Sequence, residues 1–163
     1  MVEKDELIDD GQLFTFVLSN EIYGIEISKV REVMDFKKIT TVPKTPDFMK
    51  GVINLRGGVV PVIDLRLKFG MEETEKTVDT CIIIVDITVD GEKTFIGALA
   101  DSVKEVITIE PENIEPAPKI GTKLDTDFIK GMGKHDDEFV IVLDIEKIFT
   151  TEELVAVKDI AKD

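Results

Sequence analysis

The sequence predicts a mainly β protein built from two diverged copies of one small unit, and three observations lead to this fold class. Short runs rich in β-branched residues recur along the chain. Turn signals suited to hairpins separate several of these runs. An internal repeat spans most of the chain. With 163 residues, the chain is long enough for two small β-barrels that share a core, and too short for much more.

Four segments are predicted to be buried strands because apolar residues crowd both strand faces: 13–18, 81–85, 94–99 and 139–143. Asp90-Gly91 between two such runs is a strong signal for a two-residue hairpin, since both turn positions need a positive φ. Arg56-Gly57-Gly58 plays the same part between 51–55 and 59–63. Pro61 has no N–H to donate, so it predicts an edge strand or a bulge there.

Helices are predicted to be few and short. The best is a C-terminal helix over 151–163, where Thr150 and Glu153 have the spacing of a capping box. Asp64 and Asp144 each precede a short possible helix, and aspartate is a favoured N-cap.

The repeat is the most informative feature of the sequence. Residues 23–34 match residues 96–107 at a shift of 73 (97 − 24), with Gly, Val, Glu and Val recurring in register. Residues 47–51 match 127–131 at a shift of 80 (127 − 47), and residues 60–65 match 140–145 at the same shift. We therefore expect repeat halves at 12–78 and 79–150, followed by the helix at 151–163, with a seven-residue insertion (80 − 73) in the second copy.

Composition excludes several classes of function. The formal net charge of −14 would repel a polyanion, which argues against nucleic acid and against a barrel that binds oligonucleotides. No apolar run approaches the roughly 18 to 20 residues that a membrane helix needs, so no membrane insertion is expected. The acidic N-terminus lacks the pattern of a secretory signal, which predicts a cytoplasmic protein. The single cysteine, Cys81, is interpreted as a small buried apolar residue.

The candidate chemistry is sparse, and no catalytic residue, cofactor or metal is predicted. The paired Asp64 and Asp144 raise the alternative of a small aspartate-dependent hydrolase, but neither stands in an Asp-Thr-Gly or Asp-Ser-Gly loop, and capping is the favoured role. His135 is the only histidine and is expected in an exposed hairpin turn. A carboxylate site for Ca²⁺ or Mg²⁺ remains an alternative at Asp125, Asp127 or Asp136.

Arg56 differs between the two copies. The first copy reads Asn54-Leu55-Arg56-Gly57-Gly58 where the second has 134–138, Lys-His-Asp-Asp-Glu, so the arginine and its glycines belong to one copy only. An ordinary exposed turn is one interpretation. The other is a guanidinium presented to a partner, with glycines that allow close approach.

Several motifs together resemble the CheW family of bacterial chemotaxis coupling proteins, and the match covers nearly the whole chain. They are Lys29-Val30-Arg31-Glu32-Val33, Gly51-Val52-Ile53-Asn54-Leu55-Arg56-Gly57 and Pro61-Val62-Ile63-Asp64-Leu65, with Gly97, Val103 and Glu105 in the second half. The resemblance implies a single CheW-like domain over 1–163, with two SH3-like five-stranded β-barrels and no enzymatic activity. The CheV adaptors and the CheA kinase share this module, but each would need further domains beyond this length.

The resemblance also implies the partners and their contact residues. The protein would bridge the cytoplasmic tips of chemoreceptors (methyl-accepting chemotaxis proteins) to the regulatory domain of the histidine kinase CheA, at membrane-associated receptor arrays. Carried over by position, the residues in regions that the family uses for these contacts are Val30, Glu32, Asn54, Leu55, Arg56, Gly57 and, in the second copy, Val103.

Overall fold

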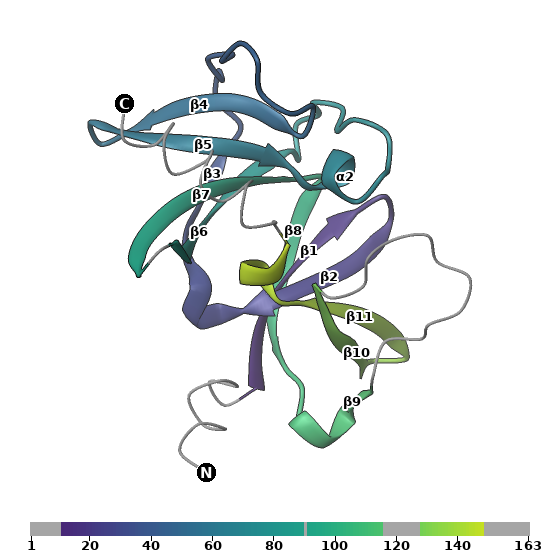
Figure 1. Cartoon of the computed structure of the whole chain (residues 1–163). Helices are drawn as coiled ribbons and strands as arrows, with labels where there is room; N and C mark the ends of the chain where they lie inside the picture. Colours follow the sequence, from purple (N-terminus) through teal and green to yellow (C-terminus); the bar gives the residue numbers. More distant parts are fainter. Residues whose placement is uncertain (1–10, 90, 116–127, 149–163) are drawn as a thin grey trace.

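The computed structural model describes residues 11–89, 91–115 and 128–148, whose strands form two sheets (Figure 1). The six-stranded sheet has the order β8-β1-β2-β11-β10-β9 and the five-stranded sheet the order β3-β6-β7-β5-β4. The first contains β1 (Gln12–Leu18), β2 (Glu21–Glu26), β8 (Ser102–Thr108), β9 (Ile114–Glu115), β10 (Ile129–His135) and β11 (Glu138–Leu143). The second contains β3 (Val30–Asp35), β4 (Met49–Leu55), β5 (Gly58–Asp64), β6 (Cys81–Val89) and β7 (Glu92–Ala100). The mainly β class is confirmed, as are the four buried strands, which fall in β1, β6, β7 and β11.

Helical structure within the described residues is limited to α2 (Leu65–Lys68) and three 3₁₀ turns, at Ile27–Lys29, Pro111–Asn113 and Ile145–Lys147. No helix in this part of the chain is long and apolar enough to cross a membrane. The helix predicted for 151–163 lies outside the described residues.

The expectation of five strands in each unit holds for one sheet only. The six-stranded sheet gains β9, which pairs with β10 at Met132 and Gly133 after the 3₁₀ turn at Pro111–Asn113. In the five-stranded sheet, the comparable contact with β4 is a single isolated bridge between Thr40 and Val52. A two-residue strand of this kind has no periodicity, so the sequence pattern could not indicate it.

Each sheet takes strands from both halves of the sequence. The hairpin β6–β7 lies in the sheet of β3, β4 and β5, whereas β1 and β2 lie in the sheet of β8 to β11. Two parallel pairings join the halves: Val62 of β5 is opposite Gly97 of β7, and Val142 of β11 is opposite Gly24 of β2. These two pairings involve residues at the sequence shifts of 80 and 73. The halves of the sequence are therefore not the halves of the structure.

The predicted hairpins are present. Arg56 and Gly57 connect β4 to β5 as a two-residue turn. Their φ angles of +51° and +85° are those required by the hairpin turn whose twist matches that of the flanking strands. β6 and β7 form the second hairpin, with Val89 opposite Glu92; Asp90 itself is outside the described residues.

His135 was expected in a turn, but it ends β10. The turn consists of Asp136-Asp137, with φ of +49° and +65°, which aspartate tolerates better than most residues.

The edge-strand or bulge prediction for Pro61 is wrong. β5 lies between β7 and β4, and the irregularity in its pairing with β4 falls at the other end, between Met49 and Gly51. Proline is accommodated because the parallel ladder with β7 begins only at Val62, one residue later. On the β4 side, hydrogen-bonded and non-hydrogen-bonded residue pairs alternate along an antiparallel ladder. Counted from the hydrogen-bonded pair Leu55–Gly58 that closes the turn, Pro61 falls in a non-hydrogen-bonded pair with Val52, so its nitrogen points away from β4.

The largest hydrophobic cluster lies between the two sheets, and each sheet also encloses a smaller cluster of its own. We call this cluster the joint core, and it contains eighteen buried residues: Phe16, Leu18, Tyr23, Ile25, Met49, Ile63, Leu65, Phe69, Cys81, Ile83, Val85, Ile87, Ile96, Ala98, Ala100, Leu143, Ile145 and Ile148. In β6, Ile83 and Val85 face the joint core, while Ile82 and Ile84 face the smaller cluster within the five-stranded sheet. Because both faces of β6 are buried, its sequence is a continuous apolar run.

The two aspartates that the sequence pairs occupy matching backbone positions. The N–H of Asp64 donates to the carbonyl of Phe48 at 2.7 Å, and that of Asp144 donates to the carbonyl of Phe128 at 2.7 Å. The Asp64 carboxylate accepts from the N–H groups of Arg66 and Leu67 in α2, and that of Asp144 accepts from the N–H of Glu146. The capping prediction is confirmed for both residues.

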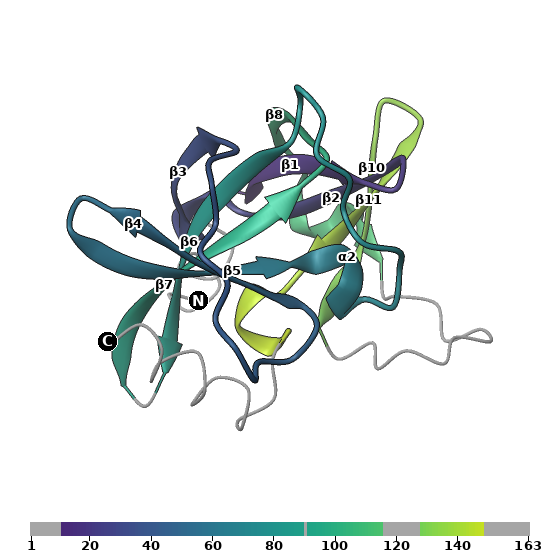
Figure 2. The same cartoon turned by 90° about the horizontal axis from the view of Figure 1, so that it is seen from above.

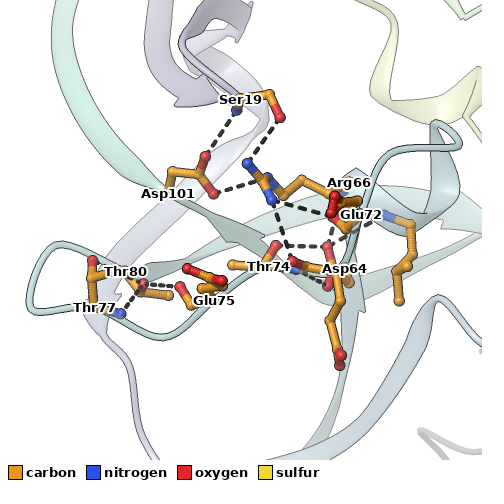
Figure 3. A network of polar contacts seen from close by, with 11 residues as sticks. Ser19, Asp64, Arg66, Glu72, Thr74, Glu75, Thr77, Thr80 and Asp101 are labelled. Atoms are coloured by element: carbon orange, nitrogen blue, oxygen red, sulfur yellow. Dashed lines mark hydrogen bonds and ion pairs between the residues drawn. The ribbon is translucent and has the colours of Figure 1, made fainter.

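The surroundings of the two caps differ. Asp64 is fully buried and also accepts from the N–H and hydroxyl of Thr74, at 3.0 and 2.8 Å (Figure 3). Arg66 extends this network to two further segments. It donates to the Ser19 hydroxyl in the β1–β2 turn at 2.8 Å and lies 3.3 Å from Asp101, which follows β7. The network therefore ties residues 71–80 and the β1–β2 turn to the end of β7.

We expect Asp64→Ala to lower the free energy of unfolding by about 3 kcal/mol and Asp144→Ala by only about 1 kcal/mol. The difference arises because the fully buried Asp64 leaves several partly buried donors without an acceptor, whereas the partly buried Asp144 leaves one. Urea unfolding of both variants measures it. Equal losses would show that the Thr74 contacts contribute nothing beyond capping.

Candidate functional site

Six of the seven predicted contact residues lie at the two edges of the five-stranded sheet. Val30 and Glu32 are on edge strand β3, Asn54 and Leu55 end edge strand β4, and Arg56-Gly57 form the turn that follows. In Figure 2, this turn is at the periphery of the molecule, on the same side as β3. The structure thus brings together residues that are about two dozen positions apart in the sequence.

An ion pair joins the two edges. The Arg56 guanidinium contacts the Glu32 carboxylate through both terminal nitrogens, Nη2 with Oε1 and Nη1 with Oε2, the latter at 3.5 Å. A second link runs nearby, where Lys37 Nζ donates to the carbonyl of Asn54 at 2.9 Å. The hydrogen bond from Arg56 lowers the pKa of the Glu32 carboxyl below its ordinary value, with the charges of Arg56 and Arg31 acting in the same direction. Glu32 is therefore ionised, and paired, at neutral pH.

The turn holds Arg56 outward from the sheet. The N–H of Gly57 donates to Asn54 Oδ1 at 3.2 Å, which orders the start of the turn. A Cβ at Gly57 would meet no atom within 4 Å, so glycine is favoured by its φ of +85° and leaves open space beside the arginine. The Arg56 side chain is 71% exposed despite its contact with Glu32. The guanidinium is thus oriented by one carboxylate while most of its surface faces solvent.

Among the residues that the structure describes, the six-stranded sheet has no such pair at the corresponding place. Asp136 occupies the position 80 residues after Arg56, and Glu105 the position 73 residues after Glu32, so both are acidic. The contacts found there are Lys104 with Glu138 at 3.9 Å and His135 with Asp136 at 3.6 Å. The presented arginine is accordingly a property of the five-stranded sheet.

Val103, the seventh predicted residue, lies on β8, which is an edge strand of the six-stranded sheet. It is opposite Phe16 of the joint core and is 41% exposed. The structure places it in a different sheet from the other six residues, on an edge strand of that sheet.

Two further valines that the sequence reasoning missed lie on the same two edge strands as Val30 and Val103. Val33 on β3 is 39% exposed and Val106 on β8 is 48% exposed. A register shift between Val30 and Glu32 places Val30 opposite Val85 and Val33 opposite Ile83, which share one face of β6. A register shift in the β1–β8 pairing likewise places Val103 opposite Phe16 and Val106 opposite Phe14.

These four residues, Val30, Val33, Val103 and Val106, are called the valine edges below. Each pair is three residues apart, which in a regular strand would place the two side chains on opposite faces. The register shifts, which are typical of β-bulges, turn both valines of each strand toward the face of the joint core. The internal repeat was the one available signal, because both pairs recur at a shift of 73.

Residues 12–153 match the family model described as the CheW-like domain. A chemotaxis protein CheW from Klebsiella aerogenes is 39% identical over 153 residues, which cover 93% of this chain and 90% of that protein. The crystal structure of the scaffolding protein TtCheW from Thermoanaerobacter tengcongensis superposes with a TM-score of 0.77 at 40% identity, covering 88% of this chain and 95% of that one.

The chain belongs to the CheW family. Its function is that of a chemotaxis scaffold which couples receptors to CheA, and the family is not enzymatic. The chemotaxis protein CheV3 from Helicobacter pylori is 26% identical over 78% of this chain, but the match covers only 40% of CheV3 itself. The match to the CheW of Klebsiella, in contrast, covers most of both proteins.

The alternative of an aspartate-dependent hydrolase is wrong for this CheW-family protein. The carboxylates of Asp64 and Asp144 each cap a separate helical segment.

Cys81 is buried, and burial raises the pKa of its thiol to about 11, with the charges of Asp35 and Asp101 adding to the effect. It is therefore not a thiolate nucleophile at neutral pH. Within the described ranges, no group of three or more His, Cys, Asp or Glu side chains is arranged to hold a metal ion; of the acidic residues considered for one, Asp125 and Asp127 lie outside these ranges.

We expect the Glu32 carboxyl to titrate below the ordinary glutamate range, and Arg56→Ala to move its pKa back up. Because the folded-state pKa is lowered, the contribution of the pair to stability is present above the unfolded-state pKa and is lost as the pH falls through the folded-state value. Carbon-detected NMR titration of the Glu32 side chain measures both values. A pKa for Glu32 that is the same in the two proteins would contradict the pairing in solution.

Proposed function

We propose that this CheW-family chain couples its partners through two surfaces: the Arg56 turn with Glu32, and the valine edges. The partners are the cytoplasmic tips of chemoreceptors and the regulatory domain of CheA. The observation that carries the proposal is the outward guanidinium of Arg56, oriented by Glu32 across the two edges of the five-stranded sheet. The mechanism is positional, because the chain holds receptor and kinase together and the chemistry belongs to the kinase.

The backbone of the turn supports a role for the Arg56 side chain. A left-handed conformation is unfavourable for a residue with a Cβ, and asparagine or glycine would form the same hairpin with less strain. An arginine in this position gains little for folding from an exposed ion pair. Arginine is, however, enriched among residues that dominate binding energy at protein interfaces, because its planar fork makes several oriented hydrogen bonds.

The valine edges supply the apolar part of the proposed contact. Partly exposed valines on two edge strands present apolar area next to unpaired backbone groups, which is a common composition for a protein interface. Both edges border the joint core, one from each sheet. A partner that covers both edges would therefore contact the two sheets at once.

We further infer that the two sheets are SH3-like barrels that arose by duplication of one unit, with halves at 12–78 and 79–150. The equivalent hydrogen bonds of Asp64 and Asp144 support this, as do the two parallel pairings at the same sequence shifts. In this view, each barrel is completed by a hairpin from the other half. The protein is proposed to work in the cytoplasm, recruited to receptor arrays through its partners.

We expect Arg56→Glu to weaken binding to at least one of the two partners by about tenfold or more, while the thermal stability changes little. Co-sedimentation with purified receptor tip, and separately with the CheA regulatory domain, measures the two affinities. If both affinities matched those of the wild type, the assignment of this turn to binding would be wrong.

The charge-swapped double variant Arg56→Glu/Glu32→Arg separates recognition from a structural effect of the ion pair. It keeps a pair of opposite charges across the two edges but removes the guanidinium from the turn. Binding that stays weak in the swapped variant supports direct recognition of Arg56. Recovery of wild-type affinity would instead show that the pair acts by holding the sheet edges together.

We expect Val103→Asp to weaken binding to a partner by about tenfold, because it places a charge in an apolar contact. Val78→Asp is the matched control, since Val78 is 100% exposed and lies between α2 and β6, outside both surfaces. The same co-sedimentation assays measure both variants. An equal effect of the two substitutions, or none from Val103→Asp, would remove β8 from the binding surface.

A further inference from the structure

Charge is distributed unevenly along this acidic chain. Residues 29–70 contain nine Lys or Arg and four Asp or Glu, a net charge of +5 in a chain whose total is −14. These residues form β3, β4, β5 and α2. The remaining residues therefore carry a net −19 (−14 − 5). Four of the nine cations, Lys29, Arg31, Lys50 and Arg66, pair with carboxylates outside this range, so the basic flank of the five-stranded sheet consists mainly of Lys37, Lys38 and Lys44.

The centre of this flank is the segment 36–46, which we call the lysine segment. It contains Lys37, Lys38 and Lys44 and no acidic residue. All three lysines are exposed, and none forms an ion pair with a carboxylate in the part of the chain that the structure describes. Charges that are already paired contribute little to recognition, so these three lysines are available to a partner.

The lysine segment is fixed along edge strand β4. The N–H and carbonyl of Thr40 bond with the carbonyl and N–H of Val52, both at 2.8 Å. The Lys76 ammonium lies 4.8 Å from the centre of the Phe36 ring, which adds a fourth cation to this region. In Figure 1, the segment lies at the top of the molecule beside β4, at the opposite end from β9.

The segment is also continuous with the Arg56 turn. Lys37 Nζ donates to the carbonyl of Asn54, two residues before Arg56. Lys37 therefore links the lysine segment to the turn that presents Arg56.

We propose that the lysine segment extends the binding surface of Arg56 and that the partner it recruits presents an acidic surface there; this inference rests on the proposed function of the Arg56 turn. Cationic groups that surround a contact steer an oppositely charged partner and raise the association rate. A second copy of this chain is disfavoured as the occupant because two molecules of charge −14 repel each other. The expected partner is thus a different protein, the receptor tip or the kinase domain, with clustered Asp and Glu.

The test is the double variant Lys38→Glu/Lys44→Glu in the full chain. Its matched control is Lys93→Glu/Lys134→Glu, which changes the net charge equally at exposed positions on β7 and β10. Association rates with the receptor tip and with the CheA regulatory domain are measured at about 0.01 M and about 0.15 M ionic strength, where the screening length is roughly 30 and 8 Å. We expect the first variant to associate about tenfold more slowly with one partner at low salt, with a smaller difference at high salt.

Three outcomes would overturn the inference. The variant could keep wild-type rates and salt dependence, or the control could slow association equally, which would show an effect of net charge alone. Sedimentation could also show that the wild type self-associates at low salt and that the variant does not, which would make a second copy the occupant. In each case, wild-type binding that still depends on Arg56 would leave the proposed function intact. Failure of the wild type to bind either partner would reject the proposed function itself.

Discussion

The parallel pairings of β5 with β7 and of β11 with β2 are the constraint on which the rest of the structure depends. Each inserts a hairpin from one half of the sequence into the sheet of the other half. The faces of these hairpins then meet in the joint core, where eighteen buried residues pack between the sheets. At roughly 1.5–3 kcal/mol for each large apolar side chain, this burial is the main force holding the two sheets together. Neither half of the sequence could bury its strands alone.

The geometry of the Arg56 turn follows from this arrangement. β3 and β4 are separated in the five-stranded sheet by β6, β7 and β5, two of which come from the other half. The twist of the sheet brings its two edges close enough for Arg56 to contact Glu32 and for Lys37 to reach the carbonyl of Asn54. A binding surface made of residues from β3, β4 and their connecting segment therefore exists only because the exchanged hairpin completes the sheet. The valine edges depend on the same packing, since they border the joint core from both sheets.

Sequence reasoning succeeded where the determinants are local. The four buried strands, the turns at Arg56-Gly57 and after Val89, and the capping roles of Asp64 and Asp144 each depend on a few neighbouring residues. It failed where the determinant is a contact between distant segments. Pro61 looked like an edge residue because the start of the parallel ladder at Val62 is not visible in the sequence. Val33 and Val106 were missed because register shifts change which face a valine occupies.

The sequence by itself determined the β class, the internal repeat, the family and the turn at Arg56-Gly57, because turn chemistry, hydrophobic runs and motifs are properties of contiguous residues. Only the tertiary structure decided how the halves combine, that β9 makes the first sheet six-stranded, and that Glu32 and Arg56 touch. The physical reason is that a strand can pair with any partner of suitable length and pattern. The choice among partners is made by which pairing buries the most apolar surface, and that is a property of the whole chain.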